Sequence, residues 1–303
     1  MLREYQSNEE LQELLQVTQS FPCFLNIHFD ILTKITERFP ENVSRYFVYR
    51  NDDGRYLIVL YRRYIMAPYR PMLAFSYDTN AKLEKKILWG IFDEISSITH
   101  SLHHHVPVTC IYGSLASYYK EWYNERFMGK TLRSNPCLMF YMIQEQQKML
   151  LEVCKNGAIS LPEEYHFDES NFESDIDVII DTGKFCNKSD HSVIKVQLRQ
   201  MPYALIRHKS TGDAVAFEYV DARGCLNHQY VLPEHRQKGL GSAVEKMVCQ
   251  KLIKENMMPF KFVELSNEKV IAASKKSKYW TCWEDSNEPI IQHWMKEYEV
   301  ENK

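Results

Sequence analysis

The sequence lacks the features of a membrane-spanning or secreted protein. In its 303 residues no apolar run approaches the roughly 18 to 20 residues that cross a bilayer, and the first residues contain no secretory h-region. The acid-rich start also argues against a mitochondrial presequence. We therefore expect an intracellular protein, cytoplasmic or mitochondrial, with no secretory signal and no transmembrane segment.

A basic tail and paired cysteines are also absent. The formal net charge is −3 and basic residues are interspersed with acids, which argues against a general nucleic-acid binder. The eight cysteines contain no Cys-x-x-Cys pair, so we interpret them as reduced, buried thiols. The run His103–His105 cannot direct three side chains at one ion without further ligands, and no metal site is expected.

The composition that is present suits a globular chain of two domains. Hydrophobic residues make up 45% and charged residues 25%, which is typical of soluble proteins. The stretch from 162 to 177 is the most polar part of the chain and is the best candidate boundary. We predict an N-terminal domain over residues 1–160 and a C-terminal domain over residues 161–303.

Apolar periodicity and turn residues predict a mixed order of helices and strands in the first half. Ser7 and Glu10 have capping-box spacing before one helix, and a second helix is expected over residues 28–39. The further expected ranges are hairpin strands 45–50 and 55–61, strand 72–77, helix 83–102, strand 106–112, a helix from 114 to about 127, and strand 137–143.

The second half repeats this order about 155 residues later, which indicates an α/β (α+β) chain with a pseudo-duplicated plan. Its expected ranges are helix 189–199, hairpin strands 203–208 and 214–220, strand 225–232, a helix to about 255, strand 260–265 and a helix from about 267. The halves differ after the third strand. Residues 77–82 contain one lysine and no glycine, whereas residues 236–241 read Arg-Gln-Lys-Gly-Leu-Gly. Only the second half is equipped to bind a phosphate.

Residues 231–242 join the third strand of the second half to its long helix through a basic turn. Gly239 and Gly241 lack a Cβ atom, so the backbone can bend tightly and approach a ligand. Free N–H groups at the helix start favour an anion, and Arg236 and Lys238 add positive charge. The turn is therefore predicted to bind a pyrophosphate.

The order hairpin, strand, Arg-x-x-Gly-x-Gly turn, helix, strand and Asn-started helix resembles the GCN5-related N-acetyltransferase superfamily. More closely, the chain resembles the glycine N-acyltransferase family. The residues that carry these likenesses are Val231–Gly241, Ser266–Glu268 with Asn267, Trp280 and Trp283. That family joins an N-terminal domain to an acyl-CoA-binding acetyltransferase domain. The resemblance implies a GCN5-related fold in the C-terminal half and a degenerate, acetyltransferase-like N-terminal half without a phosphate loop.

The resemblance implies that acyl-CoA is the co-substrate. Main-chain groups of Val231 and Leu232 would pair with the pantetheine amides because the strand splays from its neighbour, and Asn267 would contact the cofactor arm. The turn residues that would hold the CoA pyrophosphate are Arg236, Gln237, Lys238, Gly239, Leu240, Gly241 and Ser242.

The implied reaction is direct attack of an amine on the thioester, which requires a base and N–H donors for the oxyanion. The family places a glutamate early in the third strand, where this chain has Cys225, and a thiol with an ordinary pKa near 8.5 is a poor base. An imidazole is better suited, but strict alternation puts His228 on the opposite strand face from Cys225 unless a bulge intervenes. Glu218 on the adjacent strand is a third candidate.

Many superfamily members protonate the departing thiolate with a tyrosine at the position of Ser274, and a serine could at most relay a proton through water. We predict an acyl-CoA-dependent N-acyltransferase that modifies the amine of glycine or another small amino acid. Because Cys225 and Ser274 depart from the family pattern, an acyl-CoA-binding pseudo-enzyme stays an alternative. A protein or polyamine amine is the alternative acceptor.

Overall fold

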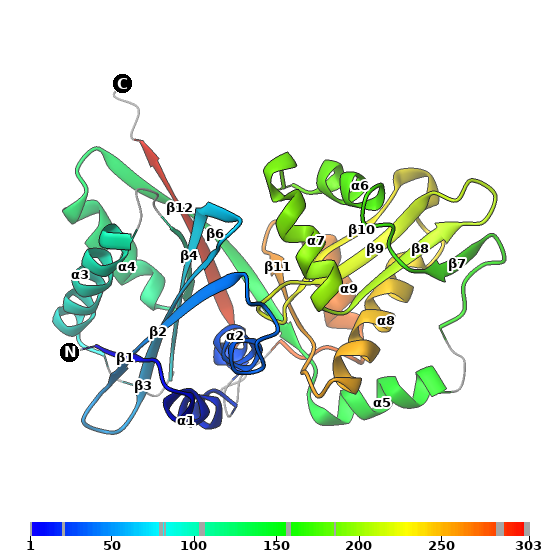
Figure 1. Cartoon of the computed structure of the whole chain (residues 1–303). Helices are drawn as coiled ribbons and strands as arrows, with labels where there is room; N and C mark the ends of the chain where they lie inside the picture. The colour runs from blue at the N-terminus through cyan, green and yellow to red at the C-terminus, as the bar shows by residue number, and fades with distance from the viewer. Residues whose placement is uncertain are drawn as a thin grey trace. The chain divides into compact units, whose positions relative to one another are not determined.

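The chain folds into two compact units (Figure 1). The computed structural model describes residues 2–19, 22–78, 81, 83–102, 107–155, 159–184, 186–282 and 288–299. One unit comprises residues 1–139, 263–271 and 282–303, and the other comprises residues 140–262 and 272–281. His103–His105 and Trp283 lie outside the described residues, as does part of the segment 77–82.

The first unit contains a sheet with the strand order β1-β2-β3-β4-β5-β12-β6. Its strands are β1 (Arg3–Tyr5), β2 (Asn42–Arg50), β3 (Tyr56–Tyr64), β4 (Ala67–Tyr77), β5 (Val108–Tyr112), β6 (Lys130–Tyr141) and β12 (Ile291–Glu299). Strand β5 runs parallel to β4, whereas β12 runs antiparallel to both β5 and β6. The last strand of the chain therefore lies inside this sheet, between two strands formed much earlier in the sequence.

Helices cover this sheet as the apolar periodicity predicts. They are α1 (Asn8–Thr18), α2 (Leu25–Ile35), α3 (Lys85–Leu102) and α4 (Leu115–Arg126). The predicted capping box is confirmed, since Glu10 N–H donates to Ser7 Oγ and Ser7 N–H donates to Glu10 Oε2. The predicted helix 28–39 is shifted. It ends at Ile35 because Glu37 adopts a left-handed φ of 51°, which an α-helix cannot continue.

The second unit has the strand order β11-β10-β9-β8-β7. Its strands are β7 (Tyr165–Asp168), β8 (Tyr203–His208), β9 (Ala214–Val220), β10 (Leu226–Val231) and β11 (Phe260–Glu264). Its helices are α5 (Gln144–Lys155), α6 (Asp175–Thr182), α7 (His191–Gln200) and α8 (Leu240–Lys254). The helix α9 (Glu268–Lys276) begins in the first unit and ends in the second. Strands β7 to β10 are antiparallel neighbours, and β11 is parallel to β10.

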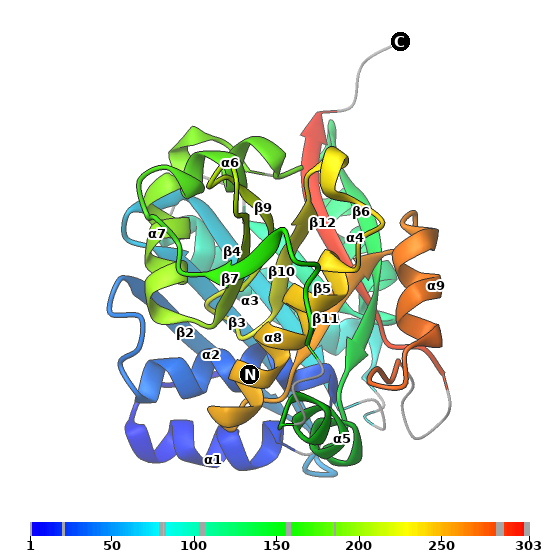
Figure 2. The ribbon, with the colours of Figure 1, turned by 90° about the vertical axis from the view of Figure 1, so that its right-hand side faces the viewer.

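Alternation along β9 defines two faces of this sheet. Phe217 and Tyr219 pack in an apolar cluster with residues of α6 and α7, whereas Glu218 between them interacts with Glu245 of α8. Figure 2, with β7 toward the viewer, shows α7 and α8 on opposite sides of the strands. The candidate base residues of the two faces are therefore separated by the sheet.

The polar stretch 162–177 contains two elements that the sequence patterns did not predict, β7 and the start of α6. Its acids are neutralised locally, because Arg207 of β8 donates to Asp168 Oδ2 at 2.6 Å and to Asp175 Oδ2 at 2.6 Å. The patterns also missed α5 and β12. The predicted hairpins, long helices and α/β class are confirmed. None of the described helices combines the length and apolarity needed to cross a membrane.

Candidate functional site

The basic turn lies between β10 and α8. A 3-10 turn over Pro233–His235 leads into it, and Gln237 and Gly239 have positive φ angles of 62° and 78°. Gly239 immediately precedes the first helical residue, Leu240. A left-handed residue at this point favours glycine, and an added Cβ would project into a space that holds no described atom within 4 Å.

The N–H groups of this turn are available to a ligand. The first helical hydrogen bond of α8 runs from Ala243 N–H to Gly239 C=O at 3.1 Å. In the described part of the chain no acceptor lies within hydrogen-bonding distance of the N–H groups of residues 237–242, and residues 236–239 are exposed. Unpaired amides at the positive end of a helix form an anion site without further side chains.

Two side chains of the turn are held by neighbouring groups. Arg236 Nε donates to Val231 C=O at 3.0 Å, and its guanidinium lies over the Tyr230 ring at 5.4 Å. Lys238 Nζ donates to Tyr165 Oη at 2.7 Å, and this hydrogen bond is the main cause that raises the pKa of Lys238. Lys238 therefore remains charged at neutral pH beside the free amides.

Strand β10 separates from β11 as it approaches the turn. Between the described residues of these strands the register contains one pair, Leu226 with Lys261, whereas β10 pairs with β9 from Leu226 to Val231. Leu232 N–H is already used, because it donates to Val215 C=O at 2.9 Å. Of the two predicted pantetheine residues, Val231 is the one whose carbonyl is directed away from β9, toward Arg236.

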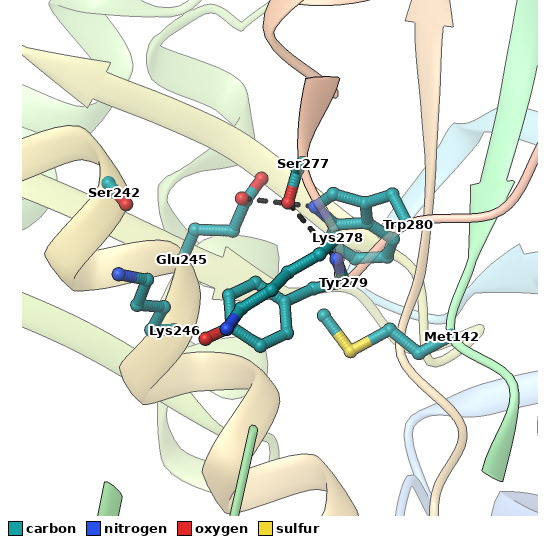
Figure 3. Close-up of a pocket in the computed structure, with 8 residues that line it drawn as sticks. All are labelled: Met142, Ser242, Glu245, Lys246, Ser277, Lys278, Tyr279 and Trp280. Atoms are coloured by element: carbon teal, nitrogen blue, oxygen red, sulfur yellow. Dashed lines mark hydrogen bonds between the residues drawn. The ribbon is translucent and has the colours of Figure 1, made fainter. Parts of the chain in front are cut away.

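A cavity opens beside the first turns of α8 within the second unit (Figure 3). It contains about 570 Å³ of empty space, part of it open to solvent. Its lining residues are Met142, Ser242, Glu245, Lys246, Ser277, Lys278, Tyr279 and Trp280. The ammonium groups of Lys246 and Lys278 lie 6.0 Å and 5.3 Å from the Tyr279 ring centre. The cavity thus combines two cations with an aromatic face, and Ser242 belongs both to it and to the predicted phosphate turn.

The inner wall of this cavity is a buried polar network. Lys261 Nζ donates to Glu245 Oε1 and lies 4.4 Å from the Trp280 ring centre, while Trp280 Nε1 donates to Glu245 Oε2 at 3.1 Å. Glu218 is 3% exposed and accepts from Gln229 Nε2 at 3.2 Å. Burial, and then the Glu245 charge, raise the pKa of Glu218 well above its usual range. Burial and the Glu245 charge therefore favour the neutral form of the Glu218 carboxyl.

His228 lies on the other face of the sheet, at a β-bulge. The pairing of β10 with β9 shifts between Asn227 and Tyr230, and His228 has a left-handed φ of 54°. The rings of Phe217, Tyr219 and Tyr230 lie 5.4, 6.2 and 6.2 Å from its imidazole centre. Burial lowers the pKa of His228 to about 4, so its imidazole is neutral at pH 7 and can accept a proton.

The end of α6 and the link that follows it bring Thr182 and Cys186 close to this imidazole. Thr182 Oγ1 lies 3.2 Å from His228 Nε2. A Cβ atom added to Gly183 would lie 2.6 Å from Cys186 Sγ and 2.8 Å from His228 Cε1, so both groups pack directly against the Gly183 backbone. Only glycine leaves room for this approach.

The other predicted residues belong to parts of the fold other than β10. Cys225 is 4% exposed, precedes β10 at the end opposite the turn, and donates from Sγ to Leu226 C=O. Ser274 is buried on α9. Asn267 belongs to the segment 263–271 of the first unit, so its contact with the cofactor arm stays a prediction. Among the described residues no group of three or more His, Cys, Asp and Glu is placed to hold a metal ion.

Sequence reasoning missed Tyr165 and Thr182, and it did not weigh Lys246 or Lys278. Tyr165 lies on the unpredicted strand β7 and holds both Lys238 and His235. A signal for it existed in the spacing of Tyr165 and Phe167, which alternate with polar residues. No linear signal connects Thr182 with His228, because their contact depends on the bulge.

Comparison with known proteins establishes the fold. The family model described as FR47-like protein matches residues 205–283. A Drosophila protein structure is 13% identical, with a TM-score of 0.66 and 97% of each chain covered. A tandem GNAT protein from the clavulanic acid biosynthesis pathway is 12% identical, with a TM-score of 0.55 and coverage of 99% of this chain and 98% of that one.

A GCN5-related N-acetyltransferase from Kribbella flavida is 10% identical, with a TM-score of 0.52 and coverage of 93% of this chain and 94% of that one. No curated protein sequence matches the chain. The whole chain therefore has the fold of the GCN5-related N-acetyltransferases, and the predicted fold class is confirmed.

Proposed function

We propose that this protein is an acyl-CoA-dependent N-acyltransferase that transfers an acyl group to the amine of glycine or another small amino acid. One observation carries the proposal: the unpaired N–H groups of residues 237–242, in a turn exposed at residues 236–239, at the point where β10 separates from β11. This arrangement suits a pyrophosphate at the turn with the pantetheine arm beside Val231. Arg236 and Lys238 supply the charge that a diphosphate requires.

The cavity beside Ser242 extends this proposal to the nucleotide end of CoA. Lys246 and Lys278 provide two ammonium groups for a phosphate, and the Tyr279 ring provides a face for a planar base. The cavity and the turn share Ser242 at the start of α8, so one ligand can reach both.

His228 is the proposed general base. A neutral amine attacks the thioester carbonyl, and its nitrogen becomes strongly acidic as the C–N bond forms. The imidazole takes that proton, the C–S bond breaks, the departing thiolate takes a proton from water to give free CoA, and the imidazolium returns its proton to water. The half-buried position of His228 beneath α6 favours a small amine over a protein side chain, because a compact acceptor needs less space.

The turn is tested by calorimetric titration of CoA into the wild type and the Gly239→Ala/Gly241→Ala variant. Loss of close approach at the charged phosphates is expected to weaken binding by roughly 10-fold to 100-fold. Gly129→Ala is the matched control, since Gly129 also has a positive φ, of 81°, and open space around it, but lies in the first unit. Unchanged CoA affinity in the double variant would exclude the turn as the phosphate site.

Transfer is tested separately by following thiol release with several acyl-CoAs and a panel of amines. Release that depends on glycine or another small amino acid supports the proposal. CoA binding without release for any pair identifies an acyl-CoA-binding pseudo-enzyme instead, and release only with polyamines or proteins changes the acceptor.

A further inference from the structure

The hydroxyl of Thr182 has one proton and three polar neighbours. Thr182 Oγ1 lies 2.7 Å from Val178 C=O, 3.2 Å from Ile179 C=O and 3.2 Å from His228 Nε2. The two carbonyls can only accept, so the hydroxyl must donate to satisfy either of them. The shortest contact is the one with Val178, the usual bond of a threonine to the carbonyl four residues earlier in a helix.

Donation to Val178 leaves only an oxygen lone pair facing the imidazole. An unprotonated Nε2 would then direct its own lone pair at this oxygen lone pair at 3.2 Å, with no proton between the two atoms. A protonated Nε2 instead donates to the hydroxyl oxygen, and all three groups are satisfied.

We infer that Thr182 holds His228 in the tautomer with hydrogen on Nε2 and thereby assigns Nδ1 as the nitrogen that accepts the proton of the amine. Thr182 is a positioning residue, since it acts through the imidazole. In the described part of the chain Nδ1 makes no hydrogen bond to a protein group, so in this tautomer its lone pair is the one that remains to accept a proton. The inference rests on the proposed transferase function only for the role of Nδ1.

The surroundings of the ring support a fixed tautomer. Phe217, Tyr219 and Tyr230 contact the imidazole as rings, so bulk water is largely replaced by aromatic surface on those sides. The bulge and the left-handed φ of His228 orient the residue toward α6, and such a backbone conformation persists only where its surroundings stabilise it. The Nε2 contact with Thr182 is then the one hydrogen bond of this ring to the described protein.

The tautomer is measured by two-dimensional NMR on protein labelled with ¹⁵N-histidine, in the wild type, Thr182→Val and Thr182→Ser. The chain has 11 histidines, and the His228 signals are assigned by their loss in His228→Gln. The wild type and Thr182→Ser are expected to show a protonated Nε2 and an unprotonated Nδ1. Thr182→Val, which keeps the shape but removes the oxygen, is expected to lose this pattern or show a mixture.

Turnover provides the second readout. Thr182→Val is expected to lower kcat by roughly 10-fold to 100-fold with little change in KM, and Thr182→Ser to restore it. A wild-type Nδ1–H pattern, or an unchanged Nε2–H pattern in Thr182→Val, would overturn the inference. If the tautomer changes while turnover does not, the assignment of the tautomer stands and the role of His228 as base is overturned. The NMR result does not depend on any activity, so failure of the proposed function is seen separately.

Discussion

At the scale of single residues, the candidate bases His228 and Glu218 lie on opposite faces of one sheet, and burial shifts their pKa values in opposite directions. Burial lowers the pKa of His228 to about 4 and keeps its imidazole neutral at pH 7, whereas burial raises the pKa of Glu218 well above its usual range and favours the neutral carboxyl. The sheet separates them, because Glu218 interacts with α8 and His228 contacts α6. His228 is the candidate whose neutral form at pH 7 follows from its pKa, and it stays the proposed base.

The lowered pKa of His228 predicts a pH dependence of stability. Burial lowers this pKa from 6.5 to about 4, so between these values the unfolded chain binds a proton that the folded protein does not. The free energy of unfolding should therefore fall as the pH falls through this window. The contribution of His228 should decrease by about 2 kcal/mol between about pH 7.5 and about pH 4.5.

Urea unfolding of the wild type and His228→Gln at several pH values measures this contribution. The variant should lose less stability than the wild type across the window, and the two should respond alike above it. Parallel curves for both proteins would show that His228 titrates normally.

The candidate base residues could be identified from the sequence, but the orientation and burial of their side chains could not. His228 was identified from its place in the predicted strand, but strict alternation gave it the wrong orientation. The bulge between Asn227 and Tyr230 changes this orientation, and the residue types do not indicate a bulge. The pKa of Glu218 also depends on its burial and on the charges of Glu245 and Lys261, which are distant in sequence. Such long-range contacts are inaccessible to local patterns.

At the scale of elements, the basic turn was predictable and its supports were not. Two glycines, two cations and the helical period of α8 all lie within one short segment, so the anion site was apparent from residues 231–253. Its supporting strand β7 lies in a stretch whose acids suggested a boundary. Arg207 of β8 compensates two of those acids, Asp168 and Asp175, which lie 39 and 32 residues away in sequence, and only the folded chain shows this.

The cavity beside α8 predicts that Lys246 and Lys278 recognise the 3′-phosphate of CoA. Wild-type protein should bind CoA more tightly than 3′-dephospho-CoA, because the latter lacks a charge that two ammonium groups contact. In Lys246→Met/Lys278→Met this preference should disappear, with a loss of roughly 10-fold in affinity for CoA.

Calorimetry with both ligands at low and high salt measures the effect, which should shrink as ionic strength rises. Lys254→Met is the control, since Lys254 ends the same helix and does not line the cavity. A preference for CoA that survives in the double variant would place the 3′-phosphate elsewhere.

At the scale of the whole molecule, the order of the chain and the order of the strands differ. Strand β12 pairs with β6 from Ile291–Leu138 to Glu299–Lys130 and with β5 on its other side. Its charged residues Lys296, Glu297 and Glu299 are typical of an exposed edge strand, so the sequence contains no strong signal for an internal one. Most of the helix and strand order of both halves was predictable, but α5, β7, the start of α6 and this internal position of β12 were not.

Removal of β12 is expected to unfold the first unit. A chain that ends at residue 288 leaves β5 and β6 without their shared neighbour, and hydrogen exchange of their amides should accelerate by at least roughly 100-fold. A chain that ends at Glu299 keeps the strand and serves as the control. A synthetic peptide of residues 288–299 should restore protection when added in trans. Wild-type protection in the chain without β12 would contradict the expectation.

The internal position of β12 also affects how the chain folds during its synthesis on the ribosome. The chain lengthens by about 150 residues between the end of β6 and the start of β12, which takes roughly 8 to 30 seconds at ordinary elongation rates. During this interval β5 and β6 have emerged without the strand that joins them, each with an unpaired backbone edge. The first unit of the nascent chain is therefore expected to need protection by chaperones. Codons that slow translation of the second unit should lengthen this interval and lower the yield of folded protein, although they change no residue of the site.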